Sequence, residues 1–115
     1  MFVIDTKDKA LAIANAANEK QAERLLLLDI RKVTSMADYF VICSGNTSRQ
    51  VKAIVDEIDY RLSAARVIPH HVEGLTESNW VLMDYGDVVV HVFDEETREY
   101  YDLEGLWGEA RRMKV

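Results

Sequence analysis

The stretch of residues 80–93 constrains the fold of this chain more than any other part of its sequence. Two apolar runs rich in valine are separated by the short segment Tyr85-Gly86-Asp87. Such runs form strands, and a glycine between them supplies the backbone freedom that a tight turn needs. The sequence therefore predicts a β-hairpin that begins at Trp80 and carries His91 in its second strand.

The hydrophobic pattern outside the hairpin predicts the remaining elements. Helical spacing of apolar residues places a first helix at 6–20, capped by Thr6, and a second at 47–65, where Thr47 and Gln50 have capping-box spacing. Short apolar runs indicate strands, which we expect at residues 24–30, 39–43 and 70–74. A last helix is expected around 103–113. The order predicts a single α/β domain over residues 1–115, with a mixed sheet of about five strands flanked by helices.

The net charge of −6 limits the classes of partner. Nucleic-acid binders neutralise phosphates with Lys and Arg, so this balance argues against direct contact with DNA or RNA and suits a basic protein partner. No apolar run is long enough to span a membrane, and no secretion signal is visible at the start. Because Cys43 is the single cysteine, no internal disulfide can form. We expect a soluble cytoplasmic protein.

A loop of small residues, Ser44-Gly45, leads into the second predicted helix and motivates the strongest catalytic alternative, nucleotidyl transfer. That chemistry needs carboxylates that hold two metal ions a few ångströms apart. Asp84 and Asp87 are the only candidates near a strand, and they flank a turn instead of alternating on one face. We therefore predict that these carboxylates stabilise the turn, and that the protein is not an enzyme.

The sequence contains the residue types of two further chemical sites, but not their spacing. Ser44, His91 and Asp84 supply the residue types of a hydrolase triad, but no G-x-S-x-G motif surrounds the serine. The adjacent residues His70 and His71 would point to opposite faces of a strand, so they cannot easily share one metal ion. We therefore predict no metal site and no cofactor.

The hairpin has the composition of a binding surface. With a period of two, Trp80 and Asp84 share one face of the strand, whereas Tyr85 falls on the other unless the turn exposes it. Tryptophan and tyrosine beside carboxylates are typical of interface hot spots. We expect Trp80 and Tyr85 to be exposed, and Asp84, Asp87 and Asp94 to be able to meet Arg or Lys of a partner.

Taken together, the motifs resemble the ribosomal silencing factor family, also called the Iojap-like proteins. The matching pieces keep the family's order over most of the chain, and they are Asp29–Arg31, Ala37–Ile42, Ser44–Val51, Glu73-Gly74, Trp80–Phe93, Arg98, Tyr101–Glu104 and Leu106-Trp107. The departures are small: Thr47 stands where serine is common, and Asn79 where glycine is frequent.

The resemblance implies a binding protein with a fold like that of a nucleotidyltransferase lacking its catalytic carboxylates. It implies docking on the large ribosomal subunit, at its fourteenth ribosomal protein, and a steric block of subunit joining that slows translation when nutrients are short. Family members often form homodimers. A scaffold for large-subunit assembly remains the main alternative.

Carried onto this sequence, the resemblance makes the hairpin the expected docking element. Trp80 and Tyr85 would be apolar anchors, Asp84 would meet a basic side chain, and His91 would add a supporting contact. Residues of second rank are Asp38, Tyr39 and Glu104.

Overall fold

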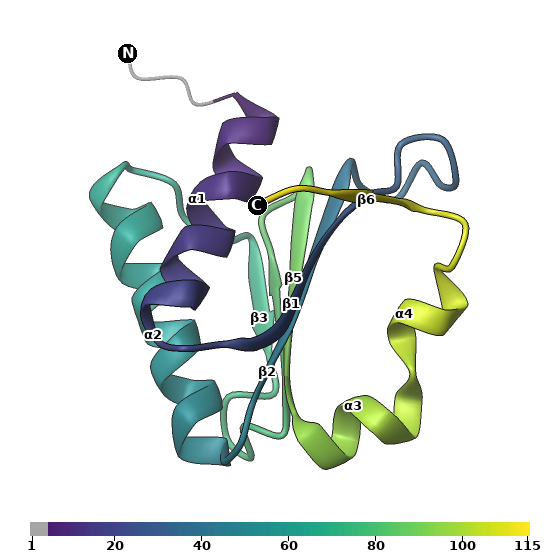
Figure 1. Ribbon diagram of the computed structural model, residues 1–115. Coiled ribbons are helices and arrows are strands. Elements are labelled where there is room, and N and C mark those ends of the chain that lie inside the picture. The colour runs from purple at the N-terminus through teal and green to yellow at the C-terminus, as the bar shows by residue number, and fades with distance from the viewer. Residues whose placement is uncertain (1–4) are drawn as a thin grey trace.

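The computed structural model describes residues 5–115, in which six strands form one mixed sheet with helices on both faces (Figure 1). The first four residues of the predicted domain lie outside the described part. The strands are β1 (Glu23–Asp29), β2 (Tyr39–Gly45), β3 (His71–Glu73), β4 (Trp80–Asp84), β5 (Val88–Asp94) and β6 (Arg111–Met113). The helices are α1 (Thr6–Glu19), α2 (Ser48–Ala64), α3 (Glu95–Tyr101) and α4 (Leu103–Leu106). The predicted α/β class with a mixed sheet is confirmed.

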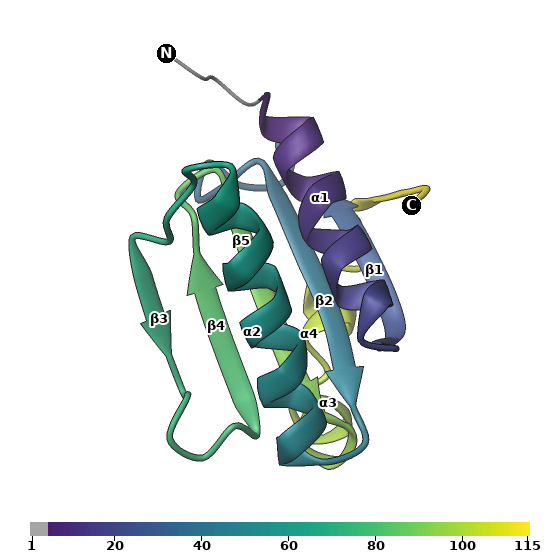
Figure 2. The ribbon, with the colours of Figure 1, turned by 90° about the vertical axis from the view of Figure 1, so that its left-hand side faces the viewer.

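The sheet has the strand order β3-β4-β5-β2-β1-β6. Only the β2–β5 pair is parallel among the described strands, and the other neighbours run antiparallel. Helices α1 and α2 cover one face, which we call the helical face, while α3 and α4 lie over part of the opposite face (Figures 1 and 2). Because β2 and β5 are central, every residue of β2 is buried.

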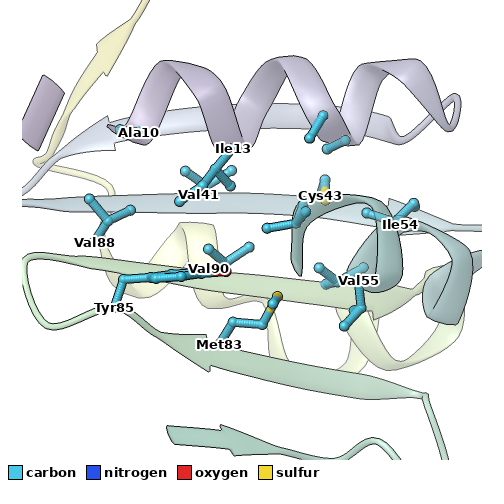
Figure 3. Close-up of a cluster of buried hydrophobic side chains, with 14 of the residues drawn as sticks. Ala10, Ile13, Val41, Cys43, Ile54, Val55, Met83, Tyr85, Val88 and Val90 are labelled. Atoms are coloured by element: carbon cyan, nitrogen blue, oxygen red, sulfur yellow. The ribbon is translucent and has the colours of Figure 1, made fainter. Parts of the chain in front are cut away.

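The largest apolar cluster lies between the sheet and α1 and α2 (Figure 3). Helix α2 buries a stripe at helical spacing, made of Val51, Ile54, Val55, Ile58 and Leu62. Its predicted cap is confirmed, since the Thr47 hydroxyl accepts a hydrogen bond from the backbone N–H of Gln50 at 3.1 Å. The Gln50 side chain in turn accepts one from the N–H of Asn46 at 2.7 Å, so both ends of this turn are satisfied.

The hairpin is formed as predicted, by β4 and β5, with Trp80 opposite Phe93. Gly86 has a φ of +89°, a conformation that favours glycine, and the Asp84 carboxylate accepts a hydrogen bond from its N–H at 2.7 Å. Alternation also holds, since Val81 and Met83 point to the helical face and are buried there. Trp80, Leu82 and Asp84 therefore share the opposite face.

Two predictions about helices are wrong. The N-cap of α1 is Asp5, not Thr6, whose hydroxyl instead donates to the Asp87 carboxylate at 2.6 Å. The predicted helix at 103–113 is replaced by the short helix α4 and strand β6, and α3 forms before them, where no helix was predicted. Asp94 caps α3 directly after β5, and the left-handed Asp102, with φ +46°, ends α3.

No helix of the described chain is both long and apolar enough to cross a membrane.

Candidate interaction site

The face opposite α1 and α2 is only partly covered, and its open part lies on β4. Trp80, Leu82 and Asp84 are each half-buried there, while Val81 and Met83 between them are buried on the helical face. We call these three residues the β4 strip. The neighbouring strand β3 is short and continues the face with His71 and Glu73, which are exposed. An accessible row of this kind, with an indole at one end and a carboxylate at the other, is suited to contact with a partner.

The Trp80 ring is held by its neighbours on three sides. It packs against Phe93 at 4.9 Å between ring centroids and against Tyr101 of α3 at 4.8 Å. Its indole N–H donates a hydrogen bond to Nδ1 of His91 at 3.2 Å. A large ring fixed in this way loses little conformational entropy on binding, which is a property of hot-spot residues.

His91 lies beneath Trp80 instead of on the surface, with 5% of its area exposed. Burial lowers the pKa of its imidazole to about 4, so the ring is neutral at physiological pH. Because Nδ1 accepts the bond from Trp80, the proton is carried by Nε2, which has no partner among the described residues. The predicted surface contact of His91 is corrected to a positioning role behind Trp80.

Tyr85 is buried on the helical face, with 3% of its area exposed, and packs in the core with Met83 and Val88 (Figure 3). Its backbone N–H bonds to the carbonyl of Val88, so the strand alternation continues to the turn and directs the ring inward. Burial raises the pKa of its hydroxyl, which has no partner within residues 5–115. The expectation that Tyr85 is an exposed anchor is therefore wrong.

Of the three hairpin carboxylates, Asp84 is the one that neither pairs with a cation nor caps a helix among the described residues. Asp87 binds the Lys9 ammonium at 2.8 Å, and although burial raises the pKa of its carboxyl, this bond and the one from Thr6 lower it overall. Asp94 accepts the backbone N–H of Thr97 and so caps α3. Both carboxylates are thus engaged inside the fold, and their contact with a partner stays a prediction.

The second-rank residues lie away from the β4 strip. Tyr39 is buried on the helical face at the end of the sheet where the hairpin turns, and its N–H and that of the half-buried Asp38 donate to the carbonyl of Asp87. The Arg31 guanidinium lies 5.3 Å from the Tyr39 ring. Glu104 accepts hydrogen bonds from Arg98 at 3.0 Å and Arg24 at 3.1 Å, which help to keep its pKa low against the opposing effect of burial. These contacts hold Tyr39 and Glu104 within the fold, and a contact of Asp38, Tyr39 or Glu104 with a partner stays a prediction.

The sequence reasoning missed the role of Arg98, which is 1% exposed. Its guanidinium donates to the Ser44 hydroxyl at 3.1 Å, to Glu104 and to the backbone carbonyls of Glu23 and Arg24. Arg98 stands in a motif with aromatic and acidic residues, which could have drawn attention to it. The spacing of that motif does not show that the arginine side chain points inward. The Ser44 hydroxyl is also bonded to the carboxylate of Glu95.

The described chain does not bring together the residues considered above for a hydrolase triad or a metal site. No hydrogen bond joins any two of Ser44, His91 and Asp84 within the part of the chain that the structure describes. Nor do the residues after position 4 contain a group of three or more His, Cys, Asp or Glu placed to hold a metal ion. Burial raises the pKa of the Cys43 thiol to about 12, so it stays protonated.

A small α/β domain with a partly exposed strip of aromatic, aliphatic and acidic residues has the features of a protein-binding domain. The chain belongs to the ribosomal silencing factor family, because the family model described as "Ribosomal silencing factor during starvation" matches residues 3–115. Its relatives are thus named for a regulatory role on the ribosome.

Individual relatives agree with this assignment. The ribosomal silencing factor RsfS of Bacillus subtilis is 47% identical over 97 residues, which cover 84% of this chain and 82% of that protein. A crystal structure of a Chromobacterium violaceum protein superposes with a TM-score of 0.89 at 34% identity, covering 91% of this chain and 88% of the other. The mouse protein "Mitochondrial assembly of ribosomal large subunit protein 1" is 31% identical over 98 residues, 83% of this chain and 43% of that protein.

Proposed function

We propose that this protein is a cytoplasmic translational repressor that binds the large ribosomal subunit at its fourteenth ribosomal protein and blocks joining of the small subunit. The family description, which names silencing and starvation, supports a role in slowing translation when nutrients are short. The protein acts by occupying space and performs no catalysis.

The observation that carries this proposal is the β4 strip. Trp80 is large, held in place and partly accessible, and Asp84 is a carboxylate without an ion-pair partner in the described chain. With a net charge of −6, the protein is attracted to a basic ribosomal protein and repelled by bare rRNA phosphates. A basic protein surface is therefore the partner that this strip fits.

The dimensions of the domain suit a steric mechanism. Its principal extents are 40 × 32 × 23 Å. A rigid body of this size, bound on the face of the large subunit that meets the small subunit, keeps the two particles from touching. Inhibition then requires only that the protein binds tightly and at this position.

The proposal also includes self-association of the protein as a homodimer. Sedimentation equilibrium measures this directly.

Purified components test the proposal. The protein is mixed with isolated large subunits and sedimented, and the joining of small subunits is then followed by light scattering. We expect stoichiometric co-sedimentation and joining that declines as the large subunits become saturated. Absence of binding, or saturated binding that leaves joining unchanged, contradicts the proposal.

A second candidate, a scaffold for large-subunit assembly, is favoured by the name of the mouse relative. It predicts that the protein co-purifies with assembly intermediates and with a third protein, and that its removal leaves precursor particles to accumulate. Gradient profiles of cells lacking the protein separate the candidates, since a repressor of joining changes the ratio of free subunits to joined ribosomes without producing precursors.

A further inference from the structure

A hollow of about 400 Å³ lies beside the β4 strip, between the start of β4, the end of β5 and helix α3. Its lining consists of Asn79, Asp94, Glu96, Thr97, Tyr100 and Tyr101. Trp80 joins the hollow to the β4 strip, because its ring packs on Tyr101 at 4.8 Å. The two surfaces are therefore one continuous region.

Two tyrosine rings form the apolar wall of the hollow and are unusually accessible. Tyr100 is 81% exposed and Tyr101 is 53% exposed, although large apolar side chains are normally buried. Their rings meet edge to face at 5.0 Å with an angle of 86° between the planes. Because Tyr101 is also packed against Trp80, Tyr100 is the ring that leaves most of its surface to solvent, and the face of an aromatic ring attracts cations.

The charges of the hollow are of one sign. Asp94 and Glu96 contribute carboxylates, and no Lys, Arg or His lines the hollow within the described residues. Glu96 is exposed and takes part in no ion pair in residues 5–115, whereas its neighbours Glu95 and Glu99 both bind Arg24. The backbone N–H of Thr97 could otherwise attract an anion, but it already donates a hydrogen bond to the Asp94 carboxylate. The hollow therefore favours a cation.

We propose that this hollow binds an arginine side chain of the basic ribosomal partner. The inference rests on the proposed function and adds a specific point of attachment to it. A guanidinium is planar, so it stacks on a tyrosine face while its N–H groups meet a carboxylate, and it sheds water more easily than an ammonium. The ring of Tyr100 supplies the face, Tyr101 supports that ring at its edge, and Glu96 supplies the carboxylate.

The chain offers a matched control for testing this inference. Glu96 and Tyr100 are four residues apart on α3, and Asp56 and Tyr60 have the same spacing on α2, in the layer that covers the helical face. Both residues of the control pair are exposed, and Tyr60 is 73% accessible. The double variants E96Q/Y100A and D56N/Y60A thus remove the same groups from two sides of the molecule.

The affinity of each full-length variant for purified large subunits is measured at two salt concentrations. We expect E96Q/Y100A to bind at least about tenfold more weakly, as for an arginine hot spot, and with a smaller loss of affinity on raising salt. D56N/Y60A is expected to stay within about twofold of the natural protein. Circular dichroism melts show that the variants are folded.

The single variants identify what occupies the hollow. Tyr100→Phe keeps the ring face and is expected to keep the affinity, whereas Tyr100→Ala loses it. If Glu96→Gln strengthens binding, the hollow faces phosphate, and the arginine inference is wrong. If E96Q/Y100A binds normally while Trp80→Ala binds poorly, the inference fails and the proposed function stands. If all these variants bind normally, the assignment of the surface fails as well.

Discussion

The indole N–H of Trp80 donates its hydrogen bond to Nδ1 of His91, at 3.2 Å, on the open face of the β4–β5 hairpin. This bond fixes the orientation of the one large aromatic side chain of the β4 strip. It requires a neutral imidazole, because a protonated one has no free lone pair to accept it. The shape of the proposed binding surface therefore depends on a histidine that is buried beneath it.

Replacing His91 with leucine should flatten the acid dependence of stability. The pKa of histidine is about 6.5 in an unfolded chain, and that of His91 is lowered to about 4 by burial. Protonation between these values favours unfolding, so the stability that depends on neutral His91 is complete above about pH 6.5 and is lost as the pH falls toward 4. Urea titrations at pH 7 and pH 5 measure the difference.

The exposed residue His71 provides the control for that comparison. His71→Gln should retain the natural loss of stability between pH 7 and pH 5, which we expect to amount to about 2 kcal/mol. An unchanged loss in His91→Leu would show that His91 does not titrate in this range.

Replacing Tyr85 with phenylalanine should leave the protein as stable or more stable. The hydroxyl is buried without a partner in the described chain, and a buried unpaired hydroxyl costs about 1 kcal/mol or more. Because Tyr85 faces α2, large-subunit binding should be unchanged, as co-sedimentation would show. Weaker binding of this variant would restore Tyr85 as a contact residue.

Replacing Gly74 with alanine should displace the backbone of Trp80 at the start of the β4 strip. Gly74 has a φ of +90°, and an added Cβ would lie 2.1 Å from the carbonyl oxygen of Trp80. We expect the free energy of unfolding to fall by about 2 kcal/mol or more, and ribosome binding to weaken because Trp80 shifts. Gly108→Ala is the control, since its nearest contact would be 3.3 Å. Equal stability of the two variants would contradict this account.

Replacing Arg98 with methionine should destabilise the whole domain. The change leaves Ser44, Glu104 and two backbone carbonyls without their buried donor, and breaking a buried ion pair costs about 3–5 kcal/mol. Arg112→Met is the control, because Arg112 is exposed. Chemical denaturation measures both, and a loss below about 1 kcal/mol for Arg98→Met would show that the network is dispensable.

The central part of the fold was predictable because local patterns and tertiary contacts agree there. The hairpin, the capping of α2 by Thr47 and the fully buried β2 all carry clear periodic or capping signals. The prediction of a helix at 103–113 was wrong because the elements of the C-terminal segment are short. Strand β6 has three residues, two of them arginine, and owes its existence to pairing with β1, for example Met113 opposite Leu27.

The candidate site was only half predictable for a similar reason. Alternation correctly placed Trp80 and Asp84 on one face, but composition could not show whether a given carboxylate is free. Asp87 and Asp94 look like Asp84 in the sequence, and only the folded chain brings Lys9 to Asp87 and the start of α3 to Asp94. The exposure of Tyr100 and Tyr101 likewise depends on where α3 lies.

Photo-crosslinking from the β4 strip tests the central claim most directly. A photoreactive amino acid replaces the half-buried Leu82, and a control chain carries it at the exposed Tyr60 on α2. After binding to large subunits and irradiation, the crosslinked protein is identified by mass spectrometry. The account predicts that position 82 captures the fourteenth large-subunit protein and that position 60 does not. Capture of that protein from position 60 alone would contradict it.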